Sequence, residues 1–164
     1  MRVLKLIALA PVSAALAGCL SYSSSDSLKP LSADLAASAR VGSILVRNVP
    51  SDVTPAFKPA LEDELRKKTS VCAKGPTELS LEVDVAEVKT QNAALTILIG
   101  SSNGIKGQAR LLGPSTGELL GDYDISHTVG GGGVLAAVGL SGAEKQMAVD
   151  FADEVCARAF PAKR

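Results

Sequence analysis

The sequence predicts an α+β fold, a two-layer sandwich in which two helices cover one face of a mostly antiparallel sheet. Several segments alternate apolar and polar residues, which is typical of strands with one buried and one solvated face. Two other segments repeat apolar residues every four positions, as amphipathic helices do. These segments follow one another in the order β-α-β-β-β-α, which places both helices on the buried face of one sheet.

The first strand and the first helix are predicted near the start of the domain. Residues 40–49, RVGSILVRNV, are rich in β-branched and apolar side chains and form the strand. The helix begins at Pro55 or Pro59, because proline is tolerated only in the first helical turn. Three acid–base pairs spaced four residues apart support its solvated side. Its buried stripe consists of Phe57, Leu61 and Leu65.

The second strand shows the clearest alternation in the sequence. In residues 78–88, ELSLEVDVAEV, acidic and hydroxyl side chains fall on one face. Basic side chains of the third strand lie opposite them, so charge pairs across the strands are expected there. The other face is apolar and is expected to be buried: Leu79, Leu81, Val83 and Val85.

The third and fourth strands, residues 105–112 and 118–129, form a hairpin around the turn sequence GPSTG. Folding the hairpin about Ser115 places Gln108 opposite Asp122. A slip by one residue would separate the buried residues of the two strands onto opposite faces. The expected buried set is Ile105, Ala109, Leu111, Leu119, Tyr123 and Ile125.

The second helix is predicted to begin at SGAE, residues 141–144, which matches a capping box, and to end near Phe160. Apolar residues again recur every four positions along one side of it. Its core-facing residues are Met147, Phe151 and Val155, with Ala148, Ala152 and Cys156 in the adjacent row.

The N-terminus matches a lipoprotein signal peptide, residues 1–18. Arg2 and Lys5 precede an apolar run that is too short for a transmembrane helix of roughly 20 residues. The segment closes on LAGC, which resembles the lipobox of bacterial lipoproteins. The resemblance implies that Cys19 carries a diacylglycerol thioether, with acyl chains such as palmitate, after cleavage behind residue 18. In the alternative, Cys19 is an ordinary cysteine after a secretory signal.

The same resemblance implies a location. Aspartate after the lipidated cysteine tends to retain lipoproteins in the inner membrane, whereas residue 20 here is leucine. The expected location is therefore the outer membrane, with the protein facing the periplasm. Residues 19–40 are rich in serine and alanine and are expected to form a flexible tether. Residues 41–164 then form a single domain.

Composition argues against nucleic acid and nucleotides as ligands. Of the 17 basic residues, two lie in the signal peptide, which leaves 15 against 17 acidic residues and a formal charge of −2. This balance provides no electrostatic attraction to nucleic acid. Gly131, Gly133 and Ala136 fit the G-x-G-x-x-G/A spacing of dinucleotide sites, but no strand follows the last helix to complete the βαβ unit. We expect no cofactor and no metal.

Two apolar, charge-free loops, residues 93–104 and 130–140, are predicted at the same end of the sheet. Two outcomes are open. The loops pack on each other, or they form an exposed apolar patch that contacts a partner protein, a lipid or the membrane. The residues expected to bind a partner are Leu95, Leu98, Val134 and Leu135.

Two cysteines remain once Cys19 is assigned to lipid: Cys72, just past the first helix, and Cys156, in the last turns of the second. The C-termini of both helices are expected at one end of the sheet, so the topology permits a disulfide in an oxidising compartment. In the alternative, Cys156 is a buried thiol.

His127 is the single histidine in the sequence and is predicted on the buried face at the end of the fourth strand. A nucleophilic triad would need a serine or cysteine beside it and a carboxylate behind it. No serine occurs in a G-x-S-x-G elbow. We therefore expect a strand-end histidine in a non-enzymatic protein.

Residues 41–160 resemble a group of small bacterial lipoproteins of unassigned function. The shared features are the apolar loop ALTILIG, the TGE hairpin turn and the glycine run after the last strand. The order of elements is also similar to that of accessory lipoproteins of envelope assembly and lipid export. The lipid anchor, the tether, the nearly neutral surface and the pair of apolar loops favour an accessory or assembly protein that binds a partner in the envelope. The alternative is a lipid-handling module that binds acyl chains, and a hydrolase based on His127 is the third hypothesis.

Overall fold

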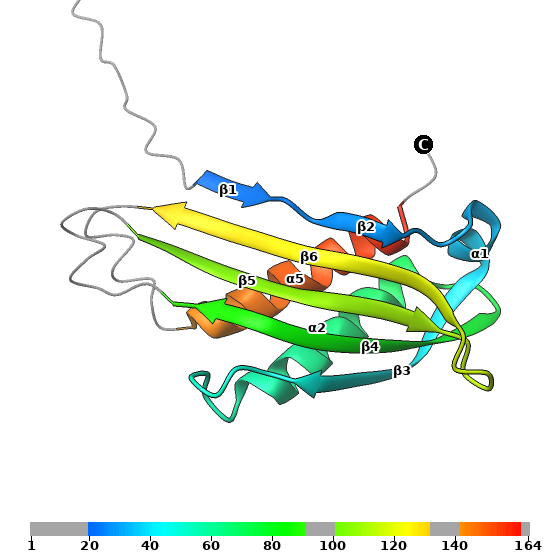
Figure 1. Cartoon of the computed structure of the whole chain (residues 1–164), viewed down its shortest axis with the longest axis horizontal. Helices are drawn as coiled ribbons and strands as arrows, with labels where there is room; N and C mark the ends of the chain where they lie inside the picture. The colour runs from blue at the N-terminus through cyan, green and yellow to red at the C-terminus, as the bar shows by residue number, and fades with distance from the viewer. Residues whose placement is uncertain (1–19, 91–100, 132–141, 162–164) are drawn as a thin grey trace, which may run out of the picture.

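The α+β sandwich is confirmed in the computed structural model, which describes residues 20–90, 101–131 and 142–161 (Figure 1). The helices are α1 (Ala33–Ser38), α2 (Phe57–Cys72) and α5 (Ala143–Ala159). The strands are β1 (Leu20–Ser23), β2 (Asp26–Lys29), β3 (Ala39–Asn48), β4 (Thr77–Lys89), β5 (Ser101–Leu112) and β6 (Leu119–Gly131).

All six of these strands belong to one sheet, in the order β1-β6-β5-β4-β3, with β2 following β1 along the same edge of β6. Only β3 and β4 run parallel, because α2 connects them as a crossover, and the other pairs are antiparallel. Figure 1 shows α2 and α5 side by side on one face of the sheet. The opposite face of the sheet carries no described helix.

The core lies between the sheet and these two helices. Leu79, Leu81, Val83 and Val85 of β4 are all buried, as the alternation predicts. The apolar stripes of both helices are buried as well, among them Phe57, Leu61, Leu65, Met147, Phe151 and Val155. Of the hairpin residues expected in the core, Leu119 alone is only half-buried.

The predicted register of the β5–β6 hairpin is wrong by two residues. Gln108 lies opposite Asp124, and Ile105 lies opposite His127. Two irregularities of one residue each cause the error. The turn is centred between Ser115 and Thr116, because the Gly113 amide donates to the Glu118 carbonyl oxygen, and the register shifts once more between Leu111 and Leu112. A shift of two residues keeps the side chains on their faces, so the buried set is still correct except for Leu119, which lies beside the turn.

Both strands of this hairpin are longer than the sequence predicts. β5 begins at Ser101 and β6 ends at Gly131, and these two residues are Cα partners. Part of each predicted apolar loop therefore belongs to the sheet. The remaining loop residues, including Leu95, Leu98, Val134 and Leu135, lie outside the described residues, as does Cys19.

Residues 20–40 are folded rather than a flexible tether. β1 and β2 pair with β6, and Ser32 caps α1 by accepting a hydrogen bond from the Leu35 amide. Composition misses this segment because main-chain pairing along a free sheet edge requires no apolar side chains. Its one buried apolar residue before α1 is Leu31.

The start of α2 agrees with one of the two predicted positions, and the start of α5 involves a contact that the sequence did not predict. Pro59 lies in the first turn of α2, which begins at Phe57. No side chain caps α5, whose N-cap is Gly142. The Glu144 carboxylate instead accepts hydrogen bonds from the backbone amide of Thr54, at 3.0 Å, and from its hydroxyl. Glu144 thus joins the starts of the two helices, whereas Ser141, the predicted capping residue, lies outside the described residues.

Candidate functional site

A polar cluster lies between the N-terminal strands, β6 and α5. We call it the serine seam, and it comprises Ser21, Ser23, Ser25, His127, Asp150 and Glu154. Ser21 Oγ lies 3.1 Å from His127 Nε2, and Asp150 Oδ2 lies 3.6 Å from the same nitrogen. The side chains of His127 and Asp150 are each 15% exposed and so are largely shielded from solvent, whereas Ser21 is exposed.

The regular spacing of residues along β1, β6 and α5 brings the side chains of the serine seam together. His127 continues the inward row of β6 after Tyr123 and Ile125, as parity predicts. Ser23 is the Cα partner of His127, and Ser21 lies two residues before it. Asp150 and Glu154 are four residues apart on α5 and so lie on one side of that helix. The sequence prediction missed these serines because it assigned them to a tether.

Ser25 lies between β1 and β2 and attaches this connection to β6. Its hydroxyl accepts a hydrogen bond from the Ser126 amide at 3.1 Å and lies 3.4 Å from the Ser126 carbonyl oxygen. Ser23 Oγ lies 3.3 Å from Ser25 Oγ. The side chain therefore takes over main-chain pairing where the edge strand is interrupted.

Glu154 is the acidic partner of the serines. Partial burial alone would raise the pKa of Glu154, but hydrogen bonds from Ser23, Ser25 and Arg158 together lower that pKa below its ordinary value. The Arg158 Nε donates at 3.3 Å from the next turn of α5. The carboxylate thus links α5 to the N-terminal strands in its ionised form.

The serine seam contains a serine, a histidine and an aspartate but does not have the geometry of a catalytic triad. In a triad, the carboxylate holds one ring nitrogen of the histidine and the nucleophile approaches the other. Here Ser21 and Asp150 both approach Nε2, and the buried Nδ1 has no hydrogen-bond partner among the described residues. The Asp150 Oδ1 accepts a hydrogen bond from Gln146. This arrangement gives Ser21 no oriented general base.

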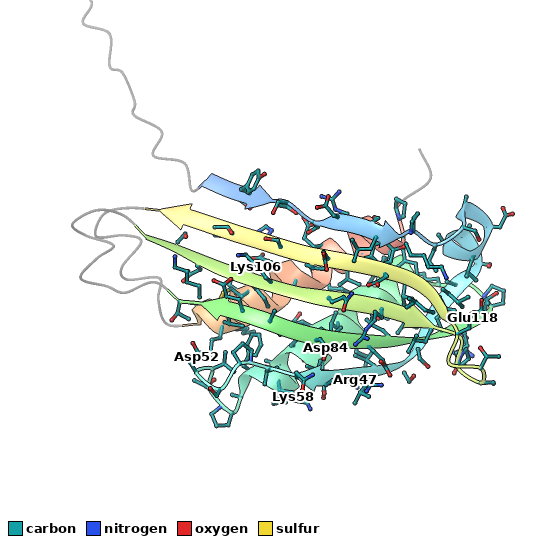
Figure 2. All side chains as sticks on the ribbon, viewed as in Figure 1. Arg47, Asp52, Lys58, Asp84, Lys106 and Glu118 are labelled. Carbon is teal, nitrogen blue, oxygen red and sulfur yellow. A yellow bond between two sulfur atoms is a disulfide. The ribbon has the colours of Figure 1, made fainter. Side chains whose placement is uncertain are left out.

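The open face of the sheet carries paired charges. The Arg47 Nε donates to Glu82 at 2.8 Å, and Lys106 lies 3.0 Å from Glu87. Arg110 pairs with Asp84, so basic and acidic strands compensate each other as expected. Figure 2 shows Arg47, Asp84 and Lys106 spread across this face. A hollow of about 1010 Å³ on it is lined by polar residues that include Gln108 and Asp124.

A second hollow, of about 590 Å³, lies between the starts of α2 and α5. Its lining is largely apolar and includes Ala56, Phe57, Ala60 and Ala143. Thr90, which directly follows β4, also lines it. The hollow therefore lies at the end of the sheet from which the predicted apolar loops extend.

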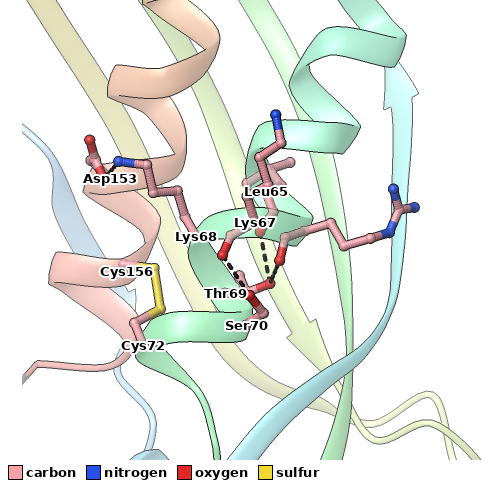
Figure 3. The surroundings of a disulfide bond; sticks show 9 residues. Leu65, Lys67, Lys68, Thr69, Ser70, Cys72, Asp153 and Cys156 are labelled. Atoms are coloured by element: carbon pink, nitrogen blue, oxygen red, sulfur yellow. Dashed lines mark hydrogen bonds and ion pairs between the residues drawn. A yellow bond between two sulfur atoms is a disulfide. The ribbon is translucent and has the colours of Figure 1, made fainter.

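The disulfide between Cys72 and Cys156 is present, with 5.9 Å between the two Cα atoms (Figure 3). It joins the last residue of α2 to α5 and closes a separation of 84 residues. Lys68 and Asp153 form an ion pair one turn away, at 2.5 Å. The helix layer is thus cross-linked at the end opposite to the Thr54–Glu144 contact.

Within the described residues, no group of three or more histidine, cysteine or acidic side chains is placed to hold a metal ion. No helix in the same part of the chain is both long and apolar enough to span a bilayer.

Comparison with known proteins gives structural matches only. No family model and no curated protein matches the sequence. The PelC dodecamer from Paraburkholderia phytofirmans matches with a TM-score of 0.51 at 13% identity, over 85% of this chain and 99% of that chain. A variant of that PelC matches with a TM-score of 0.46 at 15% sequence identity, over 85% of this chain and 98% of that chain. A "putative lipoprotein" from Caulobacter crescentus matches with a TM-score of 0.38 at 17% sequence identity, over 68% of this chain and 84% of that chain. The likeness to PelC is one of fold.

Proposed function

We propose that this protein is a non-catalytic lipoprotein, anchored through Cys19 in the outer membrane and facing the periplasm, where it binds a protein of the envelope. The observation that carries the proposal is the lipobox LAGC, which ends one residue before the fold begins at Leu20. Lipidation of Cys19 therefore fixes the bilayer next to the first strand of the domain.

The disulfide supports an envelope location. Structural disulfides form and persist in the periplasm, whereas the cytosol keeps thiols reduced. Cys72 and Cys156 come from helices that pack against each other, and their Cα separation of 5.9 Å lies in the usual range for a disulfide. Export through the N-terminal signal and oxidation of this pair are consistent with each other.

The geometry of the serine seam supports the absence of catalysis. Ser21 is the hydroxyl nearest to His127, yet the carboxylate approaches the wrong ring nitrogen. The hydrolase hypothesis requires this histidine as its base. A His127→Ala variant that keeps full function in the cell would remove that hypothesis.

The partner is proposed to bind at the end of the sheet nearest to the anchor. Leu20 is the Cα partner of Gly130, and Ser101 is the partner of Gly131. The apolar residues 93–100 and 132–140 are therefore joined to the sheet beside its lipidated edge. Leu95, Leu98, Val134 and Leu135 are the proposed contact residues.

The second candidate function is lipid handling. The apolar hollow of about 590 Å³ between the starts of α2 and α5 favours it, because this hollow lies at the same end of the sheet as the start of β1. An acyl chain that reached Phe57 from the bilayer would cross no charged face of the sheet. Bound lipid beyond the covalent anchor is the distinguishing observation.

Photo-cross-linking in living cells tests the two candidates together. A photoreactive amino acid replaces Leu98 or Leu135, and Ser115 in the opposite hairpin turn is the matched control. The adaptor proposal expects a discrete protein adduct from the first two positions and none from the control. Adducts to phospholipid alone favour lipid handling. Adducts to a second copy of this chain indicate self-assembly, as in the PelC dodecamer, and none from any position contradicts both candidates.

A further inference from the structure

We propose that residues 20–31, which we call the strap, detach from the edge of β6 while the rest of the domain stays folded. The strap is the chain between the proposed lipid anchor and α1. In the docked state it completes the sheet. In the released state it becomes the tether that its composition indicates.

Little apolar burial holds the strap. Among the strap side chains that the structure describes, residues 21–31, Leu31 is the one buried apolar residue, whereas Tyr22 is 65% exposed and Leu28 is 58% exposed. A strand in the middle of the sheet, such as β4, buries apolar side chains along its whole length. Segments with few buried apolar contacts and exposed main-chain hydrogen bonds open locally at a small cost in free energy.

Polar contacts provide the remaining attachment. Ser21 contacts His127, Ser25 contacts the Ser126 main chain, and the Leu31 amide donates to the Tyr123 hydroxyl at 2.8 Å. Each of these groups can exchange its partner for water when the strap leaves, so each contributes little net stability. The pairing with β6 is also irregular, with a register shift between Ser27 and Lys29.

The rest of the domain keeps its support without the strap. Tyr123 and Ile125 of β6 face the helix layer, and β5 pairs with β6 along its other side. The Cys72–Cys156 disulfide joins α2 to α5 and does not involve the strap. Release therefore exposes one edge of β6 and the serine seam but leaves the main core closed.

The consequence for anchoring rests on the proposed lipidation of Cys19. While the strap is docked, the end of β6 lies beside the bilayer because Leu20 is already part of the sheet. Release frees about twelve residues, and an extended chain spans at most ~3.3–3.6 Å per residue, so the domain gains a reach of about 40 Å. Strap release thus sets how far the domain stands from the membrane.

Hydrogen exchange of the mature lipoprotein in detergent micelles tests the strap. We expect the amides of β1 and β2 to exchange at least about 100-fold faster than those at residues 108–110 in the centre of β5, through openings that leave β5 protected. Equal protection of the two regions would overturn the proposal, because the strap would then open only with the whole domain.

Two variants sharpen this experiment. Tyr22 and Thr128 are Cα partners, so a disulfide between Tyr22→Cys and Thr128→Cys locks the strap, and its amides should exchange at least tenfold more slowly. Ser25→Ala should accelerate their exchange up to about tenfold, whereas Ser27→Ala, an exposed position in the same segment, should not. Unchanged strap exchange in the disulfide-locked variant, or in Ser25→Ala, would contradict the proposed attachment.

The same exchange measured on Cys19→Ser protein separates this proposal from the proposed function. That variant lacks the lipid attachment site but keeps every residue of the strap. Fast strap exchange in it supports a releasable strap even if Cys19 proves to be unmodified.

Discussion

β4 and the strap lie in the same sheet, but different forces hold them there. β4 pairs on both sides and places four consecutive inward side chains, Leu79 to Val85, in the core. The strap pairs on one side only and places serines above His127 and two carboxylates. Burial makes β4 part of the cooperative unit, whereas hydrogen bonds and a single buried leucine, Leu31, leave the strap separable from it.

The largest expected effect comes from the disulfide. Replacing Cys72 and Cys156 together by serine should lower the free energy of unfolding by about 4 kcal/mol, because the 84-residue separation no longer constrains the unfolded chain. Urea denaturation of the double variant measures this loss. Exchange of the strap amides should stay unchanged, and faster strap exchange would show that docking of the strap depends on the cross-link between α2 and α5.

Trimming a leucine in each region should give opposite results. Leu81 is fully buried in β4, so Leu81→Ala should cost about 3 kcal/mol through lost burial and a cavity. Leu28 in the strap is 58% exposed, and Leu28→Ala should change the unfolding free energy by under about 0.5 kcal/mol. A comparable loss in both variants, measured by urea denaturation, would contradict the difference between the two regions.

Glu154 should make strap docking depend on pH. Because its pKa is lowered in the folded protein, its contribution is present above the ordinary glutamate pKa and is lost as pH falls through the lowered value. Glu154→Gln should weaken docking by about 1 kcal/mol at neutral pH and remove this step. The Ser23 and Ser25 amide shifts in NMR spectra measure docking.

A matched control keeps the Glu154 experiment specific. Glu118 is exposed in the β5–β6 turn, so Glu118→Gln should leave the strap shifts unchanged. His127, Asp150 and Arg158 also face the serine seam and are unchanged in both variants. A pH step that survives Glu154→Gln unchanged would assign it to one of these neighbours.

The smallest effect is expected on the open face of the sheet. Lys106 and Glu87 are 59% and 50% exposed, and such surface pairs contribute at most about 0.5 kcal/mol. Lys106→Gln should therefore leave urea denaturation almost unchanged. A loss above about 1 kcal/mol would show that the charge pairs of this face hold the sheet together, as the serines hold the strap.

The sequence predicts the parts of this fold that burial creates. The alternation in β4 and the four-residue repeats in α2 and α5 place the core residues correctly, because the period of the apolar pattern identifies the buried face. The Cys72–Cys156 disulfide follows from the same topology. These features need no knowledge of distant contacts beyond the order of the elements.

The parts that the sequence prediction missed depend on polar or main-chain pairing. The strap has too few apolar residues to show a strand pattern, so it was expected to be a tether. The hairpin register depends on the centre of the turn and on an irregularity beside it. Glu144 binds Thr54, which lies just before α2, rather than the N-terminus of its own helix. The serine seam combines both difficulties, since its serines belong to the strap and its acids to the polar side of α5.

We propose that the fold begins directly behind a lipidated cysteine, Cys19. Intact mass spectrometry of the protein extracted from bacterial membranes tests it most directly, with Cys19→Ser as the matched variant. We predict the mass of residues 19–164 plus a diacylglycerol, with or without a further acyl chain on the amino group, and loss of the lipid mass in the variant. An unmodified chain, or a chain that begins at another residue, would contradict the account.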